Sequence, residues 1–208
     1  MPPKQRITRE MILERSFEMF CREGMEVVNA RSVAKALGCS TQPIFSYFSG
    51  MEDLKTALEQ KAKELFENAL KVEDQPGDPL INIGSAYVRF AAEQPQLFMH
   101  LFMLNINDPL FPFITEENRE KIVRDEAAYT GLTVRAAWHL FVHMSIYIHG
   151  LAATRAANKN NFSVEQMNEM IIASHMLYKK TLLYLMEHPE EQCNCPPQGE
   201  RAVPDMVE

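Results

Sequence analysis

The sequence predicts an all-α protein of about nine helices, with an N-terminal three-helix helix-turn-helix domain followed by a C-terminal helical bundle. Apolar residues recur at helical spacing along most of the 208 residues, and no segment alternates long enough to predict a strand. Segments that contain proline or glycine separate the periodic stretches. We expect domains at residues 1–50 and 51–190, and a mobile tail at 191–208.

The first helix is predicted to begin after Thr8 and to stop at Gly24. A threonine at this position can cap the free N–H groups of the first turn, and a glycine readily ends a helix. Ile12, Phe17 and Phe20 mark the apolar stripe of this helix.

Residues 31–48 predict two short helices joined by a tight turn. Gly38 supplies the left-handed backbone conformation that ends the first of them. Ser40 is expected to cap the second, and Pro43 lies in its first turn, where a missing N–H removes no bond within the helix.

The second of these short helices has a polar outer face. Ile44 and Phe48, four residues apart, are expected to point inward. The residues left outside are Thr41, Gln42, Ser46 and Tyr47. A polar face after a glycine-containing turn suits a helix that enters a DNA major groove, although a generic two-helix hairpin would give the same pattern. Downstream, Ser49 or Gly50 is expected to cap a long fourth helix.

The order and spacing of these helices resemble the DNA-binding domain of the TetR/AcrR family of bacterial repressors over residues 6–55. The matching positions are Ser16, Phe17, Phe20, Gly24, Val33, Ala34, Gly38, Cys39, Ser40, Ile44, Phe45, Ser46, Tyr47, Phe48, Glu52 and Leu54. The resemblance and the outward face together imply the DNA-binding residues Arg31, Ser32, Lys35, Ser40, Thr41, Gln42, Pro43, Ser46 and Tyr47.

Three departures from the family pattern bear on DNA binding. Gln42 and Pro43 replace the usual Gly and Ser/Thr, Phe45 replaces a Tyr, and Met51 replaces a Lys. The last two changes remove side chains that meet phosphates in the family. They raise an alternative function, a helical small-molecule sensor or protein-interaction module with weak or lost DNA binding.

The charge is distributed unevenly along the chain. The net charge is −7, but residues 1–50 carry seven Lys or Arg and five Glu, which gives +2 and leaves −9 on the remainder. Affinity for DNA depends on local cations, so the positive charge of residues 1–50 is compatible with binding to double-stranded operator DNA. With no apolar run of 18 residues and no signal peptide, we expect a cytoplasmic protein with no membrane partner.

The four cysteines do not predict a disulfide framework. Cys21 and Cys39 fall at apolar helix positions and are expected to be small core residues. Cys193 and Cys195, with His188 nearby, could bind a metal or sense oxidants, but their spacing is not that of a zinc site.

The remainder of the chain predicts six further helices. Prolines and glycines such as Pro95 and Gly131 separate several of them. The expected ranges are 51–72, 80–94, 96–104, 115–130, 133–158 and 163–188.

The last two helices are expected to form a homodimer interface, as the resemblance implies. The stripe proposed for the final helix is Met167, Met170, Ile171, Ser174, Tyr178, Thr181, Leu182 and Leu185. The same stripe could instead face the protein's own core. Trp138 and the His149-Gly150 pair also resemble a Trp…His-Gly signature of one branch of the family.

A regulator of this family would be released from a palindromic operator by a small molecule. Aromatic and methionine side chains of the predicted C-terminal bundle suit an apolar or aromatic effector. Aromatic and methionine residues at helical spacing also form ordinary cores. The residues expected to line its site are Phe90, Phe98, Phe102, Met103, Trp138, Phe141, Met144 and Tyr147.

The sequence offers little for catalysis, so no enzyme, cofactor or metal site is predicted. It contains no glycine-rich phosphate loop. His139 and His143 lie one helical turn apart, but no acidic third ligand stands where a metalloenzyme motif needs it.

Overall fold

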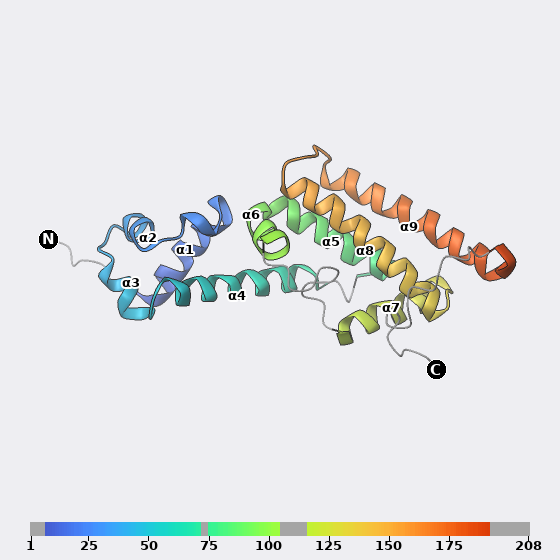
Figure 1. Ribbon diagram of the computed structural model, residues 1–208, viewed down its shortest axis with the longest axis horizontal. Coiled ribbons are helices and arrows are strands. Elements are labelled where there is room, and N and C mark those ends of the chain that lie inside the picture. Colours follow the sequence, from blue (N-terminus) through green and yellow to red (C-terminus); the bar gives the residue numbers. More distant parts are fainter. Residues whose placement is uncertain (1–6, 72–74, 105–115, 192–208) are drawn as a thin grey trace.

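The structure is a computed structural model that describes residues 7–71, 75–104 and 116–191. Figure 1 shows an elongated molecule, with a head of three helices at one end, a long connecting helix and a helical body at the other end. The elements are α1 (Arg9–Glu23), η1 (Met25–Val27), α2 (Ala30–Leu37), α3 (Gln42–Tyr47), α4 (Met51–Ala69), α5 (Pro79–Glu93), α6 (Pro95–Met99), η2 (His100–Leu104), α7 (Glu116–Thr130), α8 (Val134–Ala156), α9 (Val164–Glu187) and η3 (Pro189–Glu191).

The all-α prediction is confirmed, since the described ranges contain nine α-helices and no strand. The predicted tail and the cysteines Cys193 and Cys195 lie outside the described residues, apart from the last residue of η3. Among the helices that the structure describes, none has both the length and the apolar character needed to cross a membrane.

Local signals set the helix ends of the head, which comprises residues 7–50. The Thr8 side chain accepts a hydrogen bond from the Met11 N–H at 3.2 Å, and Gly24 ends α1 with φ 93°. Gly38 ends α2 in the left-handed conformation, with φ 66° and ψ 30°. These three predictions are confirmed.

The cap predicted for the recognition helix is wrong. Thr41, not Ser40, occupies the N-cap of α3, and its backbone is already helical with no side-chain cap. The physical reason is Pro43, which lies in the first turn and has no N–H to be capped. The next N–H, that of Ile44, already bonds the Thr41 carbonyl at 3.1 Å. The donor three residues after Ser40, which a side-chain cap there would bond, is therefore absent.

The connecting helix α4 links the buried residues of the head to those of the body in one continuous apolar core. Its first half inserts Leu54 and Leu58 into the head, where Phe20, Ile44 and other residues are also buried. Asp53 accepts a hydrogen bond from the Ser49 N–H at 2.9 Å and so fixes the entry into α4, which starts after Gly50. Cys21 and Cys39 are partly buried and pack against the core, and burial raises the pKa of the Cys21 thiol.

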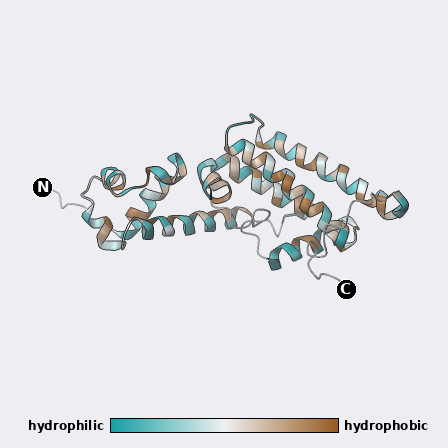
Figure 2. Ribbon diagram, viewed as in Figure 1, coloured by the Kyte–Doolittle hydropathy of each residue, from teal (hydrophilic) through white to brown (hydrophobic). Residues whose placement is uncertain are grey.

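The body is built around α8. Helix α5 packs against α8 and α9, α7 packs against α8, and α8 and α9 lie side by side in antiparallel directions (Figure 1). Figure 2 shows hydrophobic residues concentrated along α8, in the middle of the body. The segment predicted as one helix at 96–104 is instead α6 followed by a short π-helix, η2.

The apolar stripe predicted for the dimer interface partly faces the protein's own core. Met167 and Ile171 on α9 are fully buried within a single chain, so the alternative reading is correct for them. The two helices instead expose a different apolar set, which we call the outer apolar face: Ile146, Ile172, Met176, Leu177 and Tyr184.

Candidate nucleic-acid interface

The α2–turn–α3 unit exposes the polar face that the sequence predicts. Ile44 and Phe48 are buried in the head, while Gln42, Ser46 and Tyr47 are exposed. Thr41 and Pro43 are partly exposed at the start of α3. An open groove of about 690 Å³ lies on this side of the head, and its lining comprises Ile7, Met11, Leu37, Gly38, Cys39, Ser40, Gln42, Pro43, Ser46 and Tyr47.

On α3, two of the predicted contact side chains also make hydrogen bonds within the head. The Ser46 hydroxyl donates to the Gln42 carbonyl at 3.0 Å. The Tyr47 hydroxyl donates to the Ile7 carbonyl at 3.2 Å, which ties the segment before α1 to α3. The Gln42 amide makes no side-chain hydrogen bond within the described residues, so it is available for another partner.

Ser32 has a structural role that the sequence analysis did not assign. Its hydroxyl donates to the Val27 carbonyl at 2.5 Å and accepts a hydrogen bond from the Asn29 N–H at 3.1 Å. Asn29 in turn caps the Ser32 N–H, so the two residues form a reciprocal cap at the start of α2. A DNA contact from Ser32 would compete with this cap.

Cationic side chains lie on the neighbouring helix. Arg31 and Lys35 are exposed on α2, and neither has an ion-pair partner among the residues that the structure describes. Arg9 on α1 places its guanidinium 4.8 Å from the centre of the Phe48 ring, where its charge interacts with the ring face. The head thus combines a groove of mixed polar and apolar lining with exposed cations on α2.

Phe45 belongs to the exposed face of α3, although the sequence analysis did not include it among the contact residues. Its side chain is 54% exposed. The signal was present in the sequence, since Phe45 stands one residue after the inward-facing Ile44. An exposed aromatic ring on this face can make apolar contacts but offers no hydroxyl to a phosphate.

The residues predicted to line an effector site make two sets of ring contacts among the described residues. Phe90, Phe98 and Phe102 lie in a buried aromatic cluster that also contains Phe66, Tyr87 and His149. The ring centres of Phe98 and Phe102 are 4.7 Å apart, and those of Phe66 and Phe102 are 4.8 Å apart. These rings pack directly against one another.

The other predicted lining residues lie elsewhere in the body. Trp138 and Phe141 stack at 5.7 Å on α8, where Met144 is fully buried and Tyr147 partly buried. Met103 is 39% exposed, so its side chain does not belong to the packed aromatic core. Helical spacing identified the aromatic positions but not their grouping, because grouping depends on how distant helices pack.

A hydrogen bond within the aromatic cluster joins two neutral side chains. The Tyr87 oxygen lies 2.9 Å from Nδ1 of His149. Burial raises the pKa of the Tyr87 hydroxyl and lowers the pKa of the His149 imidazole, which keeps both groups neutral. The hydroxyl therefore donates and Nδ1 accepts.

Contacts around His100 join the head to the body. Nε2 of His100 lies 3.0 Å from a carboxylate oxygen of Glu59 on α4. The imidazole also packs edge-on against Phe20 of α1, with ring centres 5.0 Å apart. A shift of η2 would therefore act on both α1 and α4.

Sequence reasoning missed three buried ionisable residues of the body: Asp78, Glu126 and His175. Two signals were available. Asp78 precedes Pro79, a pair typical of a helix start, and His175 follows Met167 and Ile171 at four-residue intervals. Nothing local distinguishes Glu126 from its exposed acidic neighbours on α7.

Comparisons with known proteins address the fold. No family model matches the chain. A protein of Bacillus subtilis (strain 168), described as the uncharacterized HTH-type transcriptional regulator YobS, is 22% identical over 120 residues. The match covers 56% of this chain and 62% of that protein, so the chain spans less than two thirds of its relative.

Two solved structures are also similar. The crystal structure of a TetR-like transcriptional regulator from Rhodococcus sp. RHA1 has a TM-score of 0.59 and 16% identity, and the match covers 86% of this chain and 99% of that one. The TetR family transcriptional regulator PfmR from Thermus thermophilus has a TM-score of 0.46 and 21% identity, over 85% of this chain and 97% of that one.

The α2–turn–α3 unit of the head is a helix-turn-helix. The likeness to the Rhodococcus structure then shows, over most of the chain, the fold of a TetR-like transcriptional regulator. The resemblance drawn from residues 6–55 is thereby confirmed, and it extends through the body.

Proposed function

We propose that this protein is a ligand-responsive transcriptional regulator, a repressor that binds a palindromic operator as a homodimer and is released by a small apolar or aromatic effector. The exposed face of α3 carries the proposal, because it presents Gln42 and Ser46 and follows α2, which carries the exposed cations Arg31 and Lys35. The TetR-like fold supports it. The names of the similar proteins, all regulators of transcription, argue against an enzyme.

Within the head, we assign base readout to Gln42 and phosphate contact to Lys35. A glutamine amide can bond adenine in two places, whereas a lysine ammonium binds any phosphate. Gln42→Ala should lose roughly 1–3 kcal/mol of discrimination at one base pair. Lys35→Ala should weaken binding to all sequences and lower the salt slope by about one.

Fluorescence anisotropy with the DNA upstream of the protein's own gene tests these assignments. Lys159→Ala is the control, because Lys159 is exposed in the loop between α8 and α9, which belongs to the body and not to the head. Unchanged sequence preference in the Gln42 variant would remove it from base readout. Lys159→Ala should bind as the unaltered protein does.

The exposed Phe45 favours the alternative function, a helical small-molecule sensor or protein-interaction module with weak or lost DNA binding. Anisotropy at low salt separates the two functions. Binding that is equally weak for the upstream DNA and for an unrelated duplex would support the alternative, since non-specific binding needs only cations.

For the effector, we propose that it acts by changing the distance between the two heads of the dimer. Helix α4 ties the head to the aromatic cluster through Phe66, and His100 contacts both α4 and α1. Recognition helices must lie about 34–36 Å apart to enter successive major grooves, so a small movement breaks register.

Thermodynamic linkage gives the test of this effector mechanism. A 100-fold loss of operator affinity requires a coupling free energy of about 2.7 kcal/mol, and the operator must then weaken effector binding by the same factor. An aromatic compound that lowers operator affinity is titrated with and without saturating operator. Equal effector affinities in the two titrations would contradict the mechanism.

A further inference from the structure

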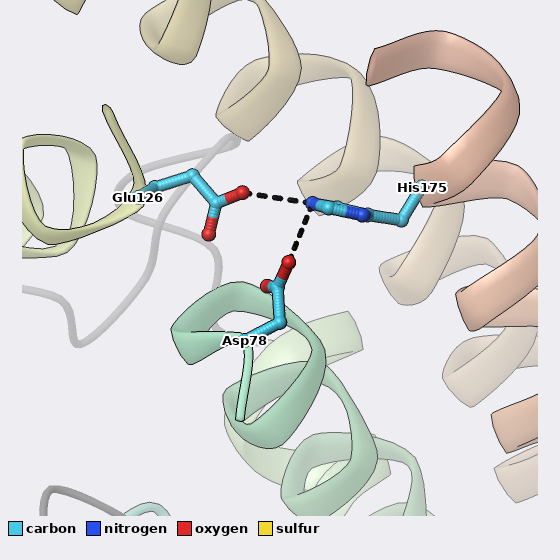
Figure 3. A group of neighbouring side chains, drawn as sticks. All are labelled: Asp78, Glu126 and His175. Atoms are coloured by element: carbon cyan, nitrogen blue, oxygen red, sulfur yellow. Dashed lines mark hydrogen bonds and ion pairs between the residues drawn. The ribbon is translucent and has the colours of Figure 1, made fainter. Parts of the chain in front are cut away.

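Three buried ionisable side chains meet in the body, and each comes from a different helix (Figure 3). Asp78 is the N-cap of α5, Glu126 lies on α7 and His175 lies on α9; their exposed fractions are 9%, 0% and 2%. Nε2 of His175 is 2.8 Å from Oε1 of Glu126 and 3.3 Å from Oδ2 of Asp78. One ring nitrogen thus faces two carboxylates.

The second oxygen of each carboxylate is held by the backbone. Oδ1 of Asp78 accepts hydrogen bonds from the N–H groups of Leu80 and Ile81, both at 3.1 Å. Oε2 of Glu126 accepts one from Leu80 at 3.4 Å. These bonds fix both carboxylates and leave one oxygen of each directed at His175, as hydrogen bonds around metal ligands commonly do.

The cluster of Asp78, Glu126 and His175 contains two carboxylates but only one nitrogen atom that faces them. The single Nε2–H of His175 cannot donate fully to both carboxylates, and no lysine or arginine of the described ranges forms an ion pair with Asp78 or Glu126. Burial, and then the charge of Glu126, raises the pKa of Asp78 to about 6. Buried carboxylates without a full partner are costly, and a cation between them would remove this cost.

The donor atoms lie slightly closer together than metal ligands do. Bonds from Zn²⁺ to histidine nitrogen or carboxylate oxygen are about 2.0–2.2 Å, so two ligands at a tetrahedral angle lie about 3.3–3.6 Å apart. The observed separations are 2.8 and 3.3 Å, and all three donor atoms lie within 4.8 Å of one another. Small movements would therefore admit an ion.

We propose that Asp78, Glu126 and His175 bind one divalent transition-metal ion, Zn²⁺ or an ion with similar ligand preferences. One imidazole nitrogen and two carboxylate oxygens suit such an ion, and three protein ligands leave a position for water or another small ligand. The ion would join α5, α7 and α9 at a distance from the DNA-binding head. This inference does not depend on DNA binding.

Metal binding is measured on the full chain, untagged, with Co²⁺ and Zn²⁺ as probes. The parent protein carries Cys193→Ser and Cys195→Ser, which removes the thiols that could bind the same metals. Asp78→Asn keeps an N-cap side chain for α5 and removes one charge, and Glu126→Gln keeps the shape of the side chain. The matched control is Asp125→Asn, an exposed acid next to Glu126 on α7.

We expect the parent and the Asp125 variant to bind one Co²⁺ per chain, and both site variants to bind it more than about tenfold more weakly. Absence of stoichiometric binding by the parent, or equal binding by the site variants, would overturn the proposal in favour of a simple buried ion-pair cluster. The Co²⁺ affinity of the parent is compared with that of whichever site variant has the same circular dichroism spectrum as the parent, since that variant is correctly folded. A second measurement is the parent's melting temperature, which Zn²⁺ should raise relative to EDTA; no rise overturns the proposal.

Discussion

Polar side chains of the head make mostly local hydrogen bonds, apart from that of Tyr47 to Ile7, whereas the body adds bonds between distant helices. In the head, Thr8 and Asn29 cap the helices that follow them, and Asp53 accepts a hydrogen bond from the Ser49 N–H four residues earlier. In the body, Tyr87 bonds a histidine 62 residues away, and His175 bonds a glutamate 49 residues away. Local bonds define the ends of the head's helices, whereas long-range bonds fix how the body's helices pack.

The exposed surfaces of the two regions differ as well. The head presents polar groups such as Gln42 and Ser46, but the body presents the outer apolar face, where Met176 is 63% and Leu177 is 70% exposed. A polar face suits contact with nucleic acid, and an uncovered apolar face suits contact with another protein surface. The predictions that follow test this contrast.

The largest effect is expected at the outer apolar face. Leu177→Glu should convert the proposed dimer into a monomer of 23.9 kDa, because each copy would bury a carboxylate at a cost of several kcal/mol. Sedimentation at micromolar concentration measures the mass, and circular dichroism should show an unchanged fold. Glu187→Gln, at the exposed end of α9, is the control. A monomeric unaltered protein would contradict the assignment of this face.

Phe66→Ala should have the next largest effect, since Phe66 is buried against Tyr87, Phe90 and Phe102 where α4 enters the body. We expect the free energy of unfolding to fall by about 3–5 kcal/mol. Urea denaturation followed by circular dichroism gives the value. The exposed neighbour Leu65, changed to Ala, should cost no more than about 0.5 kcal/mol. Similar losses in both variants would show that the cluster does not hold α4 to the body.

The contrast between local and long-range contacts also explains what could be predicted from sequence. Gly24 and Gly38 were identified as helix ends because the left-handed conformation is a local property of those residues. The Ser40 cap was wrong because a proline three residues later removed the donor it would have bonded. Both cases concern residues close together in the chain.

The partners of side chains in the body could not be predicted from residues close together in the sequence. Helical periodicity placed Phe98 and Trp138 inside the protein but could not show which rings of the described residues each contacts. It also assigned Met167 to a dimer face, whereas the packing of α5 and α9 buries it. Asp78, Glu126 and His175 come together only because three helices converge.

Two glycines of the body allow the effect of helix packing on stability to be compared with the effect of helix propensity. A Cβ at Gly84 on α5 would lie 2.6 Å from Cδ1 of Ile148 on α8, so Gly84→Ala should destabilise the protein by about 1–3 kcal/mol. Gly150 lies inside α8 with no atom within 4 Å of a Cβ, so Gly150→Ala should stabilise the chain by up to about 1 kcal/mol. Thermal unfolding compares the two, and a stabilising Gly84 variant would mean that α5 and α8 have room to separate.

The smallest effect is expected from the buried pair of Tyr87 and His149. Because burial lowers the pKa of folded His149, the unfolded chain binds a proton at this residue at a higher pH than the native protein does. Stability should therefore fall as the pH is lowered from above 6.5 through the folded pKa. In His149→Gln the amide oxygen can still accept the Tyr87 hydrogen bond, but the proton-binding site is gone. Denaturation at pH 7.5 and below 6 should show a smaller loss of stability for this variant than for the unaltered protein. Other titrating groups, including His139, are present in both proteins and cancel in the difference. Parallel pH profiles would show that His149 takes up its proton equally in the folded and unfolded chains.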